Sequence, residues 1–102
     1  MKKFKVGILT FSDGRKYIHE DLLATNQRYQ SRLAEALEAT GEVEVVVGTQ
    51  IICTPKIARR EAQRLAAEGV EITIFNYAIW AFPHLTGVAS KFAPGPYLLF
   101  CN

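Results

Sequence analysis

The spacing of hydrophobic residues along this chain changes at regular intervals. Val6–Phe11 is almost continuously apolar, as expected of a strand that is covered on both faces. From Tyr17 to Thr40 the apolar positions instead recur at helical spacing, with charged residues on the opposite side. Val43–Val47 is short and rich in valine, so it predicts a second strand that ends at Gly48.

The second half of the chain repeats this alternation. Thr54 and Pro55 have the chemistry of a helix cap followed by proline at the first helical position, and this helix is expected to end at Gly69. The remaining predicted elements are a third strand at Ile72–Phe75 that runs on toward Trp80, a short helix from Pro83 to about Phe92, and a fourth strand at Tyr97–Cys101.

Strictly alternating strands and helices predict an α/β fold with an open parallel sheet. We expect about four strands in the flavodoxin-like order 2-1-3-4, with helices on both faces (a three-layer αβα domain over residues 1–102). Right-handed crossovers place the first helix on one face and the other two helices on the opposite face.

The predicted fold is truncated, because strands three and four have no helix over them on the first helix's side. Both strands are nevertheless apolar on both faces, which is typical of strands that are covered twice. We therefore expect exposure among Ile72, Ile74, Leu98, Phe100 or their alternating neighbours, and this bare surface is a candidate docking site.

Composition narrows the function classes only slightly. Of the 102 residues, 49% are hydrophobic and 22% charged, as in a soluble globular protein. A net charge of +2 gives no reason to expect nucleic acid or acidic membranes as partners. The apolar run after the N-terminal lysines is too short for an export signal, and two widely separated cysteines suggest a reducing cytoplasm.

In open α/β sheets, ligands bind beyond the carboxyl ends of the strands, near the point where the strand order reverses. This rule selects the turn Ser12–Arg15 after strand one and the segment from Asn76 to Trp80 after strand three. Strand two contributes Gly48, Thr49 and Gln50.

Arg15 and Trp80 are the strongest candidates for substrate binding, and each has a structural alternative. The Arg15 guanidinium suits hydroxyl, carboxylate or phosphate groups, but it could equally form a surface ion pair with Asp13 or Glu20. The Trp80 indole could stack on the C–H face of a sugar, or it could pack in the core beneath the third helix. Asp13 and Asn76 are further candidates, although such residues often serve only to form turns.

Other residues carry weaker signals. His19 and His84 have no metal-ligand spacing, and we expect both to be solvated near helix ends. Cys53 and Cys101 are expected to be small buried hydrophobic residues rather than nucleophiles. The chain also lacks the sequence patterns of a flavin phosphate loop, a dinucleotide fingerprint and a phosphoacceptor receiver.

Three stretches of the chain are similar to the N-terminal domain of the L-fucose and L-arabinose isomerase family. Val6–Phe11 followed by Asp13-Gly14-Arg15 resembles that family's first strand and Asp-Gly-Arg turn. Ile72–Pro83 resembles its third strand and tryptophan-bearing loop, and Pro96–Phe100 its next strand.

The resemblance implies a place in a cytoplasmic, homo-oligomeric, manganese-dependent aldose–ketose isomerase. It implies that Arg15 and Trp80 contact the sugar in a neighbouring subunit's active site. The family's metal-binding residues lie in later domains, so we expect this chain to contain no catalytic residues and no metal or other cofactor. It would then serve in substrate recognition and assembly, with the remaining domains and neighbouring subunits as partners.

The alternative is a stand-alone flavodoxin-like module that binds a small polar ligand. A reading frame that continues past Asn102 with acid and histidine metal ligands would favour the isomerase.

Overall fold

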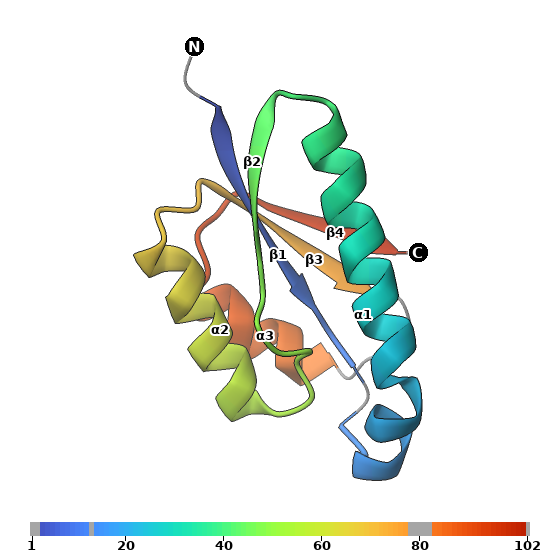
Figure 1. The fold of residues 1–102 in the computed structure, drawn as a ribbon. Coiled ribbons are helices and arrows are strands. Elements are labelled where there is room, and N and C mark those ends of the chain that lie inside the picture. The colour runs from blue at the N-terminus through green and yellow to red at the C-terminus, as the bar shows by residue number, and fades with distance from the viewer. Residues whose placement is uncertain (1–2, 13, 78–82, 102) are drawn as a thin grey trace.

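The order of strands and helices follows the predicted alternation (Figure 1). The computed structural model describes residues 3–12, 14–77 and 83–101. Boundaries differ from the predicted ones by only a few residues. The elements are β1 (Phe4–Thr10), α1 (Lys16–Ala39), β2 (Val43–Val47), α2 (Pro55–Ala67), β3 (Ile72–Tyr77), α3 (Pro83–Phe92) and β4 (Tyr97–Cys101).

The four strands form a parallel sheet in the order β2-β1-β3-β4, which confirms the predicted arrangement. In the register of the central pair, Val6 lies beside Ile72 and Thr10 beside Asn76. On the outer side of β3, Ile74 lies beside Leu98 and Asn76 beside Phe100. All four carboxyl ends therefore point to the same end of the domain.

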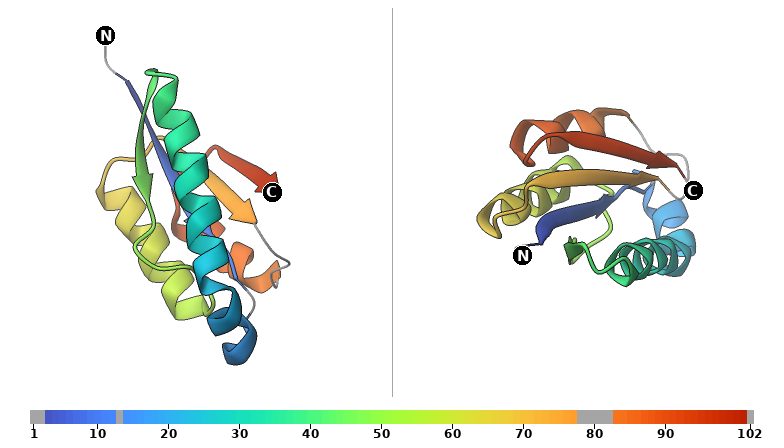
Figure 2. Two further views of the ribbon diagram at one scale, coloured as in Figure 1. Left: turned by 45° about the vertical axis from the view of Figure 1, so that its right-hand side comes forward. Right: turned by 90° about the horizontal axis from the view of Figure 1, so that it is seen from above.

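Helices α2 and α3 pack on one face of the sheet, over the larger of two apolar cores (Figure 2). Leu9, Phe11 and Phe75 contribute the strand side of this core. A glycine in β1 lets α2 approach closely, because a Cβ at Gly7 would lie 2.7 Å from a methyl carbon of Leu65. Thr54 caps the N-terminus of α2, as predicted, by accepting a hydrogen bond from the backbone N–H of Ile57.

Helix α1 packs on the opposite face over a smaller core. Val6, Ile8 and Ile74 form the strand side, and Ala34 is the buried residue from the helix. Leu33 and Leu37 of α1 pack against the same cluster. Each helix thus covers the face that right-handed crossovers predict.

Strand β4 is exposed along its whole length. Leu98 and Phe100 share the α1 face with Ile74 and Asn76, and Leu98 is 55% exposed. This confirms the predicted bare surface beside α1. The exposure extends further than expected, because Leu99 on the other face is 62% exposed and α3 does not cover it.

Candidate functional site

Three chain segments meet at the carboxyl ends of the central strands. The backbone N–H of Ser12 donates to Ile52 O (2.7 Å), and Ile52 N–H donates to Thr10 O (2.8 Å). On the other side, Phe11 N–H donates to Asn76 O (3.1 Å). These bonds extend the sheet beyond its regular strands and fix the start of the turn after β1 against the loop after β2.

A buried chain of polar side chains crosses this edge on the α1 face. Asn76 Nδ2 donates to Thr10 Oγ1 (3.1 Å), whose hydroxyl donates to Gln30 Oε1 (2.7 Å). Gln30 Nε2 in turn donates to the carbonyl of Gly48 (3.4 Å). The chain joins β3, β1, α1 and the end of β2, and buried polar groups joined in this way fix one arrangement of the elements.

A second polar cluster surrounds Ser12, beyond the carboxyl end of β1. Asn26 Nδ2 donates to Ser12 Oγ (3.2 Å), and His19 Nδ1 lies 3.0 Å from the same oxygen. The Ser12 oxygen can accept from Asn26 Nδ2 and from an Nδ1–H of His19, or donate its own hydrogen to Nδ1, so the direction of this bond follows the tautomer of the imidazole.

The loop after β2 is held by a buried carboxylate. Glu61 of α2 is 2% exposed and accepts from the backbone N–H groups of Thr49 (2.5 Å) and Gln50 (3.3 Å). The Thr49 hydroxyl lies 2.9 Å from Glu61 Oε2 and donates to this carboxylate. Arg64 Nε lies 3.8 Å from Glu61 Oε1, so the buried charge has both hydrogen-bond donors and a nearby cation.

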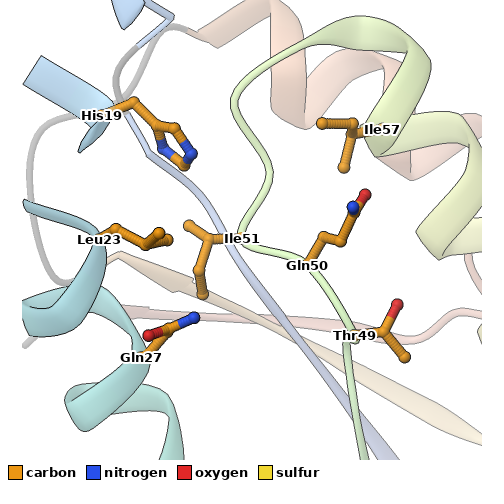
Figure 3. Close-up of a pocket in the computed structure, with 7 residues that line it drawn as sticks. All are labelled: His19, Leu23, Gln27, Thr49, Gln50, Ile51 and Ile57. Atoms are coloured by element: carbon orange, nitrogen blue, oxygen red, sulfur yellow. The ribbon is translucent and has the colours of Figure 1, made fainter. Parts of the chain in front are cut away.

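A pocket of about 190 Å³ lies between α1 and this loop, at the carboxyl edge of the sheet (Figure 3). The His19 imidazole points into it from the start of α1, and the wall opposite is formed by the loop after β2 and the first turn of α2. The described lining residues are His19, Leu23, Gln27, Thr49, Gln50, Ile51 and Ile57. Their polar groups are an imidazole, two amides and a hydroxyl.

Of the four residues predicted to bind substrate, two lie within the described part of the chain. Arg15 is exposed at the N-cap of α1, and its carbonyl accepts from His19 N–H (2.9 Å). Asn76 is fully buried and bonded to Thr10, so it joins strands at the base of the site. Asp13 and Trp80 fall outside the described residues, as does the crevice that Arg15 and Trp80 were predicted to share.

The two histidines differ in their surroundings. The prediction of a solvated His19 is wrong, because the ring is partly buried, bonded to Ser12 and facing the pocket. The cause is Ser12, two residues past the end of β1, whose hydroxyl gives the imidazole a partner within the fold. His84 is exposed on α3, as predicted.

Both cysteines are free thiols. Cys53 lies in the loop before α2, and burial raises the pKa of its thiol. Cys101 is exposed at the end of β4 rather than buried, which corrects the prediction for that residue. Burial also raises the pKa of the Tyr77 phenol, and its hydrogen bond with Thr86 only partly lowers this pKa again.

Sequence reasoning selected Thr49 and Gln50 from the switch-point rule, but it missed Glu61 and the role of His19. A signal for Glu61 was present, because it falls on the same helical face as Ile57, Ala58 and Leu65. An acidic residue on an apolar helix face requires a hydrogen-bonded partner inside the fold.

Within residues 3–12, 14–77 and 83–101, no three His, Cys, Asp or Glu side chains gather closely enough to hold a metal ion. None of the helices in the same part of the chain combines the length and apolar character needed to cross a membrane.

Comparison with known proteins gives one result that covers nearly the whole chain. A family model described as "L-fucose isomerase, first N-terminal domain" matches residues 3–101. Neither the curated proteins nor the solved structures contain a match to the chain. The matched range includes both the turn after β1 and the segment that follows β3.

Proposed function

The chain belongs to the L-fucose isomerase family as a first N-terminal domain, and we propose that it recognises the sugar substrate and takes part in subunit assembly. The family match carries this proposal, since it spans all three segments on which the resemblance of the sequence rests. In this role the chain is not catalytic by itself, and the aldose–ketose chemistry takes place on residues of other domains.

Arg15 and Trp80 are the proposed sugar contacts. The position of Arg15 supports this role, because it is exposed where β1 leads into α1, at the edge of the sheet where ligands bind in such folds. Its guanidinium presents several donors to sugar hydroxyls. Asp13 lies two positions before Arg15 in the sequence, and Asn76 donates to Thr10 near the carboxyl end of β3.

Manganese is the metal that the family implies for the complete enzyme. The described residues of this chain contain no suitable group of carboxylate and imidazole donors, so they do not fit such a site. We therefore assign no step of the reaction to a metal held by this chain. Its contribution is to bind and orient the sugar.

The exposed strand β4 supports the proposed part in assembly. Four large apolar side chains, Tyr97, Leu98, Leu99 and Phe100, are exposed in succession, and the strand lies at the edge of the sheet. Such an edge presents unpaired backbone groups together with apolar surface, which favours association with further structure. We propose that the remaining domains or a neighbouring subunit of a homo-oligomer cover it.

Kinetics of L-fucose isomerisation by the complete enzyme test the recognition role. Trp80→Ala and Arg15→Ala should each lower kcat/KM. The loss of transition-state stabilisation calculated from each ratio should be about 1–3 kcal/mol, the scale of one lost substrate contact. Arg28→Ala removes an exposed arginine from the middle of α1 and serves as the matched control. Unchanged kcat/KM in both site variants would refute the proposed contacts.

A further inference from the structure

The pocket between α1 and the loop after β2 has the dimensions of a site for a small molecule. Its volume of about 190 Å³ lies below the range of roughly 300–1,000 Å³ typical of drug-sized ligands. It opens at the carboxyl edge of the sheet, where α/β folds place their ligands. A compact ligand smaller than a typical drug is therefore the appropriate size.

The hydrogen-bonding groups around the pocket are partly occupied by partners within the protein. Ser12 occupies Nδ1 of His19, so Nε2 is the ring nitrogen left for a ligand, as donor or acceptor according to the tautomer. Gln50 Oε1 accepts from Arg60, so the amide nitrogen of Gln50 remains as a donor. The Thr49 hydroxyl donates to Glu61, so its oxygen can still accept. With the Gln27 amide, the pocket offers both donors and acceptors at short range.

The other walls of the pocket are apolar. Leu23, Ile51 and Ile57 contribute aliphatic side chains, and the described lining residues include no carboxylate, lysine or arginine. A cation would find no carboxylate here, and an anion would find no lysine or arginine, to offset the hydration that each loses. Hydroxyl groups, by contrast, both donate and accept, and the carbon backbone of a polyol can lie against the aliphatic walls.

From this lining we propose that the pocket binds a small uncharged polyol. The wall formed by Thr49 and Gln50 is held in place by the buried Glu61, which reduces the conformational entropy lost on binding. None of the lining residues is among those proposed to contact the isomerase substrate. The site is thus additional to the proposed function, and it stands even if Arg15 and Trp80 have no role in recognition.

Titration of the 15N-labelled 102-residue chain with xylitol, followed by 1H–15N NMR, tests this proposal. The amides of Leu23, Thr49, Gln50 and Ile51 should shift in a saturable manner, with a dissociation constant in the millimolar range expected for so few contacts. Inorganic phosphate at the same concentrations should shift them less. No isomerase activity enters this measurement, so its outcome is separate from that of the kinetic test above.

Two variants remove one polar group each from the pocket. His19→Ala and Gln27→Ala should weaken xylitol binding by about three- to tenfold, the effect of one lost hydrogen bond. Gln27 is exposed, so its replacement leaves the fold intact even if His19→Ala does not. Gln63→Ala, an exposed glutamine on α2 outside the pocket, should bind as the parent chain does. Absence of saturable shifts, stronger binding of phosphate, or unchanged affinity in Gln27→Ala would overturn the proposal.

Discussion

At one edge of the sheet, β2 is tied to its surroundings by side chains, whereas β4 at the other edge is left open. Gln30 of α1 donates to the carbonyl of Gly48, and Arg64 of α2 donates to the carbonyl of Val47. Glu61 then holds the two residues that follow. Strand β4 begins with a tethered residue, since the Tyr97 hydroxyl donates to a carbonyl of α3 (2.6 Å), but the apolar residues after it are exposed.

This difference shows that one small sheet can have one edge strand covered and bonded by helices, here β2, and another exposed, here β4. The β2 edge carries an exposed charge at Glu44 and is held between α1 and α2, as is usual for edges protected against association. Leu98–Phe100 carries no charge and lacks such cover. The open edge is consistent with a domain that is covered by other parts of a larger assembly.

Removing the Glu61 carboxylate beside β2 should have the largest effect on the free energy of unfolding. Glu61→Ala leaves the backbone N–H groups of Thr49 and Gln50 without their acceptor, and we expect a loss of about 3 kcal/mol in the free energy of unfolding. Urea denaturation followed by circular dichroism measures this loss. Glu35→Ala, which removes an exposed glutamate from α1, should change stability little. Equal stability of the two variants would show that the carboxylate does not hold the loop.

The reactivity of the two free thiols should also differ between the β2 and β4 edges, by a smaller factor. Cys53 lies beside the β2 edge, where burial raises the pKa of its thiol, and Cys101 is exposed in β4. A raised pKa leaves less thiolate at a given pH, so Cys53 should react several-fold more slowly than Cys101 with a disulfide reagent. Its rate should also continue to rise at a higher pH than that of an ordinary thiol.

Stopped-flow absorbance with Cys101→Ser and Cys53→Ser separates the two reactions. Loss of the fast phase in Cys101→Ser is the expected result. A fast phase that survives in that variant would show that the loop beside β2 is as open as β4.

The smallest effect on stability is expected at the open edge. Leu99 is 62% exposed, so Leu99→Lys should change the free energy of unfolding of this chain by no more than about 0.5 kcal/mol. In the complete enzyme the same charge should weaken assembly, because it would be buried against another domain or subunit. Size-exclusion chromatography with light scattering measures the assembly. An intact oligomer would remove β4 from the proposed interface.

Local patterns determined most of the fold. Continuous apolar runs and helical spacing predicted every element of the described chain, since the periodicity of a strand or helix is carried by neighbouring residues. The order 2-1-3-4 was predicted from among the few arrangements that alternating elements and right-handed crossovers allow, and it is the observed one. The bare surface of β4 followed too, because a fully apolar strand was predicted where no helix could reach one face.

Tertiary structure alone decided which polar residues meet. Glu61 binds the loop after β2, and His19 reaches Ser12 and faces Thr49 and Gln50 across the pocket. These partners lie on different elements, and their pairing depends on the depth at which each helix packs against the sheet. The spacing of hydrophobic residues predicts which face of each helix packs against the sheet, and therefore the layers of the fold. It carries no information on which hydrogen-bonding groups face one another once those layers are packed, because that is fixed by side-chain geometry across the interface between them.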